Sequence, residues 1–246
     1  MRYPIIFWDS GGTIFHSADR PEGFAGCPSP GDVRKNRAFR AGHALEMFGH
    51  TLPPDLPRVI DDLEAGLRLR HGARYSLDVL AEGMYDELGI AQRKEEALLL
   101  ADALGGPRYH AWLWDGVADA LAALHRTGVR MGVIADTHLT GRMMRRALAG
   151  VGLADFFGPV VCSCDLGVQK PDRRIFETAL AALAPSAASS GPVLYVGDNL
   201  TKDIDGAAAC GWDAALHLTT PANPQSKAVL TFSDYRDLVR LALEEG

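Results

Sequence analysis

Short apolar runs alternate with longer amphipathic stretches along most of the chain. A continuous apolar run of four to eight residues is typical of a buried strand, and apolar positions three and four residues apart are typical of a helix. The pattern predicts strands at 3–8, 129–135, 160–163, 193–196 and 214–218. It predicts helices at 116–127, 141–149, 172–184, 203–210 and 233–244. This alternation indicates an α/β fold, a Rossmann-like, doubly wound parallel sheet with helices on both faces.

Residues 31 to about 106 follow a different pattern, with apolar positions at helical spacing and no convincing strand. Leu56, Ile60 and Leu67 share one helical face, and Leu80 and Met84 share another. The stretch 18–30, rich in Pro, Gly and Ser, is typical of a linker or loop. We therefore expect an α/β core of residues 1–17 and 111–246, interrupted by an all-helical insert at 18–110.

Composition and charge narrow the class of protein. The chain has 246 residues, 47% of them hydrophobic, and a formal net charge of −6. An acidic chain lacks the positive field that a general nucleic-acid binder needs. Its four cysteines have no CxxC spacing, and no apolar run is long enough to span a bilayer. We expect a cytoplasmic protein that binds neither nucleic acid nor membrane, and the pattern indicates no particular oligomeric state.

Carboxylates follow three of the predicted strands. Asp9, Asp136 and Asp198 each come directly after an apolar run, and Asp203 starts the next helix after Asp198. Because ligands bind beyond the carboxyl ends of parallel strands, we expect these groups to meet at one edge of the sheet. Clustered carboxylates repel, and a divalent cation such as Mg²⁺ relieves that repulsion. For the segment Asp198 to Asp203 alone, a metal site and a structural role, with Asp198 in a turn and Asp203 at a helix start, are equally good explanations.

Lys170 follows the predicted third strand and precedes Pro171. By itself it is typical of a surface lysine. Beside a carboxylate nucleophile and a phosphoryl group, its charge would hold both in place.

Together these motifs resemble the haloacid dehalogenase (HAD) superfamily over nearly the whole chain. The resemblance rests on Asp9 to Thr13, on Lys170-Pro171, and on Gly197-Asp198 through Asp203, and the insert resembles the helical cap of one large branch. It implies a hydrolase of phosphatase type that acts on a small phosphorylated metabolite with Mg²⁺ as cofactor. Asp9 would form an aspartyl-phosphate, Lys170 would orient nucleophile and substrate, and the cap would close over the site.

The resemblance also assigns binding residues. Metal ligands would come from Asp9, from the backbone carbonyl of Gly11, and from Asp198, with Asp203 in or next to the metal shell. Gly12, Thr13, Thr137 and Lys170 would contact the substrate, and Asp136 belongs with Asp9 and Lys170 among the catalytic residues.

The first motif departs from the family at Gly11, where phosphatases carry an aspartate that protonates the leaving oxygen and later activates water. Glycine has no side chain that can transfer a proton, and general acid–base catalysis contributes about 10²–10⁴ in rate. Its carbonyl is still present, so metal binding can survive where proton transfer does not.

The second motif departs at Ala135, where the family has Ser or Thr to bind phosphoryl oxygens. Loss of one such donor costs about 10²–10³ in rate. Asp136 stands where the family usually has Asn and adds negative charge. Thr137 or His138 could compensate, although a histidine in this position is more often a turn or capping residue.

Three functions therefore stay open at this point. The first is a metal-dependent hydrolase whose missing acid comes from the cap, for instance from His43 or Glu46. The second is a phosphonatase-like enzyme that uses Lys35 or Lys94 for a Schiff base. The third is a degenerate member that binds a ligand or partner. A metal-free dehalogenase fits less well, because Asp198 and Asp203 keep the pattern of a cation site.

Overall fold

The structure is a computed structural model that describes residues 1–16, 26–91, 93–185, 191–219 and 226–244. It contains one six-stranded sheet in the order β3-β2-β1-β4-β5-β6, in which all neighbouring strands are parallel. The strands are β1 (Ile5–Trp8), β2 (Arg130–Ala135), β3 (Val160–Cys162), β4 (Val193–Gly197), β5 (Asp213–His217) and β6 (Leu230–Phe232). The predicted α/β class is thus confirmed.

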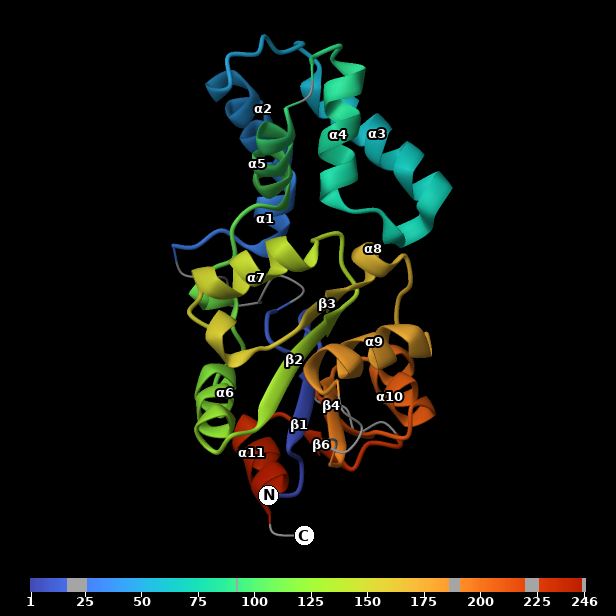
Figure 1. Ribbon diagram of the computed structural model, residues 1–246. Coiled ribbons are helices and arrows are strands. Elements are labelled where there is room, and N and C mark those ends of the chain that lie inside the picture. Colours follow the sequence, from blue (N-terminus) through green and yellow to red (C-terminus); the bar gives the residue numbers. More distant parts are fainter. Residues whose placement is uncertain (17–25, 92, 186–190, 220–225, 245–246) are drawn as a thin grey trace.

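Helices cover both faces of the sheet (Figure 1). Side chains alternate between the faces of a strand, so β1 sends Ile6 and Trp8 to one side and Ile5 and Phe7 to the other. The first pair packs in the hydrophobic cluster that holds α6, α7 and α11, and the second packs with α9 and α10. The helices of this part are α6 (Val117–Arg126), α7 (Gly141–Gly150), α8 (Ser163–Leu166), α9 (Arg173–Leu183), η5 (Leu200–Asp205, π-helical), α10 (Gly206–Ala209) and α11 (Tyr235–Leu243).

The central strand β1 pairs with β2 on one side and β4 on the other, in register along its whole length. Trp8 lies beside Val133 and Val196, so the residues that follow β1, β2 and β4 emerge at the same edge of the sheet. This edge faces the second group of helices.

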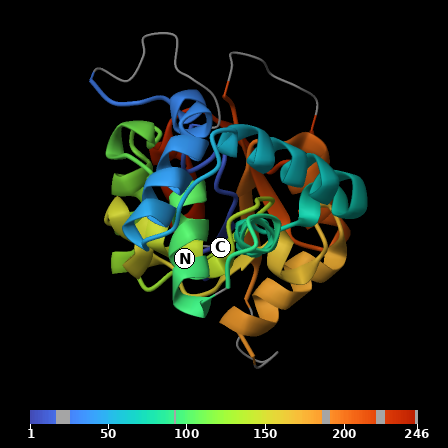
Figure 2. The same cartoon turned by 90° about the horizontal axis from the view of Figure 1, so that it is seen from above.

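That second group contains five helices between β1 and α6 and, among the described residues, no strand. Figure 1 shows it standing beyond the carboxyl edge of the sheet, and Figure 2 shows it lying over the sheet when seen from above. The helices are α1 (Pro30–Lys35), α2 (Arg37–Met47), α3 (Leu56–His71), α4 (Leu77–Glu87) and α5 (Lys94–Gly105). We call residues 30–105 the cap. Short 3₁₀ turns lie at η1 (Gly72–Arg74), η2 (His110–Trp112) and η3 (Ala154–Phe156).

The structure differs from the sequence pattern in several details. The strand β6 was not predicted, because its three residues give too short an apolar run. The helix predicted at 203–210 begins earlier, as the π-helical turn η5, and continues as α10. The predicted start of the insert at residue 18 lies outside the described residues. Among the residues that the structure describes, no helix combines the length and the apolar character that crossing a bilayer requires.

Candidate active site

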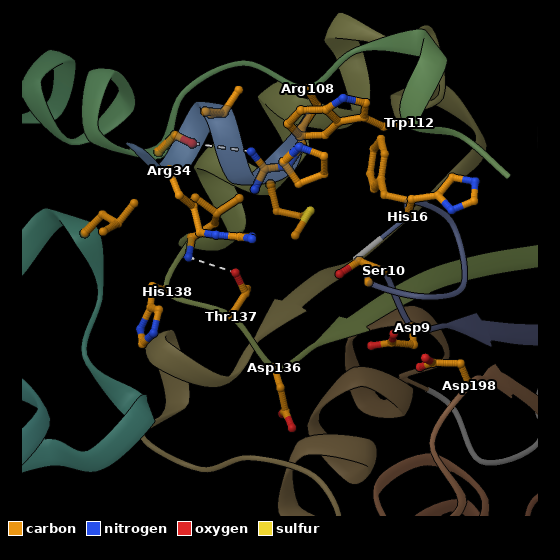
Figure 3. Close-up of a pocket in the computed structure, with 18 of the residues that line it drawn as sticks. Asp9, Ser10, His16, Arg34, Arg108, Trp112, Asp136, Thr137, His138 and Asp198 are labelled. Carbon is orange, nitrogen blue, oxygen red and sulfur yellow. Dashed lines mark hydrogen bonds between the residues drawn. The ribbon is translucent and has the colours of Figure 1, made fainter. Parts of the chain in front are cut away.

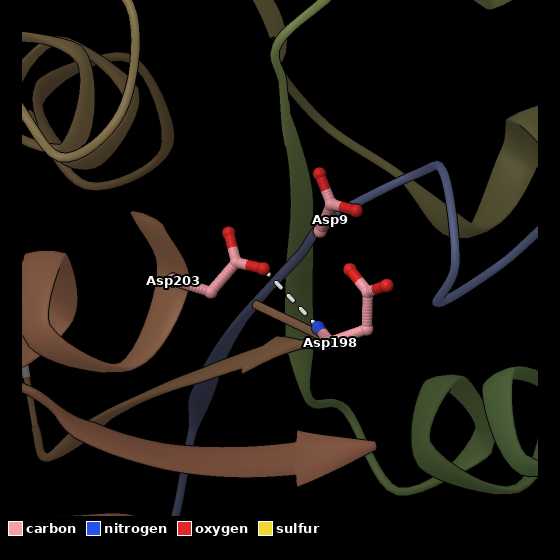
Figure 4. Close-up of side chains that lie close together, drawn as sticks. All are labelled: Asp9, Asp198 and Asp203. Atoms are coloured by element: carbon pink, nitrogen blue, oxygen red, sulfur yellow. Dashed lines mark hydrogen bonds between the residues drawn. The ribbon is translucent and has the colours of Figure 1, made fainter. Parts of the chain in front are cut away.

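Three carboxylates lie together at the carboxyl edge of the sheet. Asp9 follows β1 directly, Asp198 follows β4, and Asp203 comes from η5 one turn later. One carboxylate oxygen from each lies within 4.8 Å of the others, and Figure 4 shows the three side chains converging. The sequence prediction that distant acidic residues meet here agrees with this geometry. Asp136, after β2, lies on the same edge and lines the same cavity.

Lys170 lies between two of these carboxylates. Its Nζ donates to Asp9 Oδ1 at 2.6 Å and to Asp203 Oδ1 at 2.7 Å, and it donates to the hydroxyl of Tyr195 at 2.9 Å. The Tyr195 hydroxyl in turn donates to the carbonyl of Ile134 at 3.1 Å. Lys170 is almost completely buried, with 2% of its surface exposed. All three donors of the ammonium group are therefore used, and its position is fixed.

Asp203 is held through both carboxylate oxygens. Oδ1 accepts from Lys170, while Oδ2 accepts from the backbone N–H groups of Asp198 and Asn199 at 3.1 and 2.9 Å. Asn199 in turn caps η5 by accepting from the backbone N–H groups of Thr201 and Lys202. Asp203 thus holds both the lysine and the turn that carries Asp198.

Negative charge exceeds positive charge in this cluster. Burial raises the pKa of Asp9 to about 7, although Lys170 opposes the shift. Burial and the neighbouring Asp203 raise the pKa of Asp198 to about 6. Burial alone would lower the pKa of Lys170, but Asp9, Tyr195 and Asp203 raise it well above its usual range. A carboxylate whose pKa rises in this way gains from any further positive charge.

Gly12 permits the close approach of Asp198. Its φ is +83°, a conformation that favours glycine, and a Cβ at this position would lie 2.0 Å from Asp198 Oδ2. The backbone at Gly12 and the carboxylate of Asp198 therefore occupy adjoining space that no side chain can enter. The carbonyl of Gly12 accepts from His217 Nδ1 at 2.8 Å, which ties the turn after β1 to β5.

The neighbours of Gly12 differ in exposure. Gly11 is exposed and lines the cavity. Thr13 is fully buried, and its carbonyl accepts from the hydroxyl of Tyr235. Neither Gly12 nor Thr13 lines the cavity, and their contact with a substrate stays a prediction.

At the turn after β2, neighbouring groups compensate for the negative charge of Asp136 and for the hydroxyl that Ala135 lacks. Asp136 Oδ1 accepts from the backbone N–H of Lys170 at 3.0 Å, and Oδ2 lies 3.2 Å from Lys202 Nζ. Its charge is therefore compensated. Thr137 Oγ1 accepts from the backbone N–H of Leu139, so its hydroxyl proton is left to donate into the cavity that it lines.

His138 is oriented toward the cap. Its Nδ1 lies 2.9 Å from the carbonyl of Tyr75, and its ring stacks on the Tyr75 ring with centroids 4.1 Å apart. His138 thus has a long-range structural contact rather than a turn or capping role of its ring, and it also lines the cavity. It joins the loop after β2 to the start of α4.

A cavity of about 430 Å³ opens between this edge and the cap. Asp9 and Asp198 lie at its base, and Arg34, Arg108 and Trp112 lie on the cap side (Figure 3). This size suits a small metabolite. His43, Glu46, Lys35 and Lys94, which the sequence offered as cap acids or Schiff-base lysines, are exposed and do not line it.

Several residues of the site had not been predicted from the sequence. Lys202 lies one residue before Asp203, and its position within the fourth motif was the available signal. Tyr195, which contacts Lys170, is one of five consecutive buried residues of β4 and gave no signal. Arg108 lies alone in the segment after α5 and gave none either.

Comparisons with known proteins agree with this geometry. A family model described as haloacid dehalogenase-like hydrolase matches residues 3–211. Among curated relatives, phosphoserine phosphatase of Thermus thermophilus is 32% identical over 167 residues, which are 65% of this chain and 62% of that protein. N-acetylmuramic acid 6-phosphate phosphatase of Pseudomonas aeruginosa is 25% identical over 87% of this chain and 81% of its own length.

Solved structures show the same fold. A HAD phosphatase from Thermococcus onnurineus superposes with a TM-score of 0.56 at 19% identity, covering 100% of this chain and 99% of that one. A 2-haloacid dehalogenase from Pseudomonas syringae superposes with a TM-score of 0.59 at 19% identity and 98% coverage of both chains. Because the two neighbours carry different activities, the fold alone does not choose between phosphate esters and halogenated acids.

Proposed function

The chain belongs to the haloacid dehalogenase-like hydrolases, and from this premise we propose that it hydrolyses small phosphate monoesters with Mg²⁺ through a covalent intermediate on Asp9. The family and its phosphatase-named relatives make the chain an enzyme of phosphatase type. The observation that carries the finer proposal is the contact of Asp9 with buried Lys170, beside the two further carboxylates Asp198 and Asp203.

The donor set suits a hard divalent cation. Three carboxylates meet one ammonium group, so negative charge remains after Lys170 is counted. No side chain among the described residues donates to Asp198 or to the second oxygen of Asp9. We propose that Asp9, Asp198 and the carbonyl of Gly11 hold Mg²⁺, which prefers such oxygen ligands and would stabilise the charge of the phosphoryl oxygens.

Asp203 has a different role in this proposal. Because both of its oxygens already accept hydrogen bonds, it positions Lys170 and the backbone at Asp198. It would therefore orient the groups that hold the metal without binding the metal itself.

The residues of the site would carry out most steps of one catalytic cycle. The carboxylate of Asp9 bonds to phosphorus, and the bond from phosphorus to the ester oxygen breaks. Lys170 orients Asp9 and favours its ionised form. Thr137 and Lys202 line the cavity and would bind phosphoryl oxygens in place of the donor that Ala135 lacks. Water then attacks the aspartyl-phosphate and releases phosphate, which restores Asp9. The leaving alcohol takes its proton from solvent, since Gly11 cannot supply one.

This proposal fits the cavity better than the alternatives do. The cap lysines that a Schiff-base mechanism requires do not line the cavity. A metal-free dehalogenation would leave the half-buried carboxylate of Asp198 without a positively charged partner.

Phosphate release and Mg²⁺ binding, both measured on wild type and variants, test this proposal. We expect Mg²⁺-dependent release of phosphate from p-nitrophenyl phosphate, lost on chelation, and a decrease of at least about 10³-fold in Asp9→Asn. In calorimetric titration with MgCl₂, we expect binding to the wild type that Asp198→Ala abolishes.

An exposed cap carboxylate provides the matched control, and Asp61→Ala should bind Mg²⁺ like the wild type. Turnover that survives chelation, or metal binding that is equal in wild type and Asp198→Ala, would contradict the proposal.

A further inference from the structure

The cap side of the cavity is lined by arginines. Arg34 comes from α1, Arg37 and Arg40 from α2, and Arg108 from the segment after α5. By their spacing in the sequence, Arg34, Arg37 and Arg40 are compatible with a solvated helix face or with an anion site. Their place in the cavity favours an anion site for some of these arginines. The hydrogen bonds and ion pairs of each arginine show which ones are available to bind an anion.

Two of these four arginines already bind other groups of the protein. Arg37 forms an ion pair with Glu64, with Nη1 3.0 Å from Oε1. Arg40 donates to three backbone carbonyls, of Val33, Ala103 and Leu104, and so ties α1 and α2 to the end of α5. These two arginines hold the cap together.

Arg108 and Arg34 lack such partners. Arg108 Nη1 makes only two long contacts of 3.3 Å, to the carbonyls of Gly105 and Pro107, and its guanidinium lies 5.5 Å from the Trp112 ring centroid. Within the part of the chain that the structure describes, no carboxylate forms an ion pair with Arg108 or Arg34. Figure 3 shows both on the cap side of the cavity.

These two cations also act on each other. Burial, followed by the charges of Arg34 and Arg40, lowers the pKa of Arg108 to about 10. The side chain therefore stays protonated at neutral pH, in a place where positive charge accumulates without an acidic neighbour. A half-buried positive charge without an acidic neighbour favours an anionic ligand.

We propose that Arg108 and Arg34 form a second anion subsite, which binds an acidic group on the organic part of the substrate. The inference rests on the proposed function, because it assumes that the ester phosphate lies at Asp9 on the opposite wall. The guanidinium fork matches the two oxygens of a carboxylate or a second phosphate. The substrate class is then a small phosphate ester with a second anionic group, of a length that fits a cavity of about 430 Å³.

A pair of substrates with one carbon skeleton tests this assignment. 3-Phosphoglycerate carries a carboxylate where glycerol 3-phosphate carries a hydroxymethyl group. We expect kcat/KM to be at least about tenfold higher for 3-phosphoglycerate, and we expect Arg108→Met to bring the ratio close to one, since a hydrogen bond to a charged group is worth about ten- to one-hundredfold. Propane-1,3-diol bisphosphate, compared with its monophosphate, shows whether phosphate serves as well as carboxylate.

Two further variants keep the test decisive. Arg34→Met changes an exposed side chain, so it reports on the subsite even if Arg108→Met does not fold. Arg70→Met removes the same charge from the exposed face of α3, outside the cavity, and should leave the ratio unchanged.

Three results would contradict the subsite. The first is an equal kcat/KM for both members of each substrate pair in the wild type. The others are a preference for the doubly anionic ester that persists in Arg108→Met and Arg34→Met, or a decrease in kcat/KM that is equal for both esters in these variants. If neither ester nor p-nitrophenyl phosphate is turned over, the proposed function fails. Calorimetric titration of the intact esters then decides the subsite separately, since tighter binding of the doubly anionic ester that depends on Arg108 supports it and equal binding contradicts it.

Discussion

Gly11 stands two residues after Asp9 at the mouth of the cavity, where the related phosphatases have an aspartate that moves protons. The carboxylate cluster and Lys170 around Asp9 are complete, whereas the group that would protonate a leaving alcohol is missing from this position. The bond to phosphorus can therefore form, but a poor leaving group has to depart without help. The identity of the leaving group then controls the rate.

Replacing Gly11 by aspartate should restore that help. We expect Gly11→Asp to raise kcat for an alkyl phosphate such as glycerol 3-phosphate by tenfold or more, within the range of about 10²–10⁴ that general acid catalysis contributes. The rate for p-nitrophenyl phosphate should change much less, because p-nitrophenolate leaves without a proton. The measurement is kcat for both esters at saturating Mg²⁺ in wild type and variant.

Gly11→Ala is the matched control, because it adds a side chain that cannot carry a proton. If Gly11→Asp gives no gain for the alkyl ester, or if the wild type already hydrolyses both esters equally fast, another residue supplies the proton.

For individual residues, the sequence identified the acidic side chains and Lys170 but not the hydrogen bonds that each one makes. Asp203 follows Asp198 by five positions, and that spacing is compatible with either a metal ligand or a helix-start carboxylate. Only the hydrogen bonds show that both of its oxygens are already used. Lys202 was missed because a lysine inside a loop is ordinarily solvated.

The turn from β4 into η5 carries two of the three clustered carboxylates and depends on a glycine at its start. Gly197 is the last residue of β4, and a Cβ there would lie 2.4 Å from Asp203 Cγ. The close packing of strand end and helix start therefore needs a residue without a side chain.

Gly197→Ala should disturb this turn. We expect a loss of about 1–3 kcal/mol in the free energy of unfolding, because an added methyl group in a packed site forces its neighbours to shift. Turnover should fall as well, since Asp203 would no longer hold Lys170. Urea unfolding and phosphatase assays measure the two effects.

Gly150→Ala provides the comparison at the end of α7, where an added Cβ meets no atom within 4 Å. This variant should keep its activity and be equally or slightly more stable, because alanine has the better helix propensity. Equal stability of the two alanine variants would show that the contact with Asp203 does not constrain Gly197.

The order of elements could be predicted well where amphipathic periods were long, as in α6 and α9, because burial on one face imposes the pattern directly. Short elements were harder. β6 has three residues, and Cys164, which alternates with Cys162 in sequence, lies in α8 because the strand ends at Cys162. Three residues are too few for a period to appear.

The whole molecule is a sheet edge facing a helical cap, and the cavity lies between them. Sequence predicted the cap as a helical insert, but it did not predict which cap residues would face Asp9. That depends on how α1, α2 and the segment after α5 pack on each other, and the ties of Arg40 to Ala103 and Leu104 are long-range contacts without a sequence signature.

Two histidines, buried His217 and half-buried His138, make the stability of this arrangement depend on pH. Burial lowers the pKa of His217 in the core and of His138 at the junction with the cap, although backbone carbonyls oppose both shifts. In the unfolded chain these side chains take up protons near pH 6.5, whereas the folded protein resists until lower pH. At these two side chains the unfolded state then binds more protons, so their contribution to the free energy of unfolding should fall as pH drops below about 6.5. Asp9 and Asp198, whose pKa values are raised, contribute in the opposite direction.

His217→Gln should reduce this dependence, because glutamine can still donate to the carbonyl of Gly12 but does not titrate. The measurement is guanidinium unfolding at pH 8 and pH 5.5 for wild type and variant. His43→Gln, at an exposed position on α2, should leave the wild-type difference unchanged. A difference that is identical in the wild type and His217→Gln would show that His217 does not contribute.

The central claim is that Asp9 accepts a phosphoryl group in a site completed by a divalent cation. Beryllofluoride mimics a phosphoryl group on a carboxylate, and ¹⁹F NMR detects it when bound. We expect a bound signal for the wild type with Mg²⁺, lost on chelation and absent in Asp9→Asn. No bound signal in the wild type, or the same signal in Asp9→Asn, would contradict it.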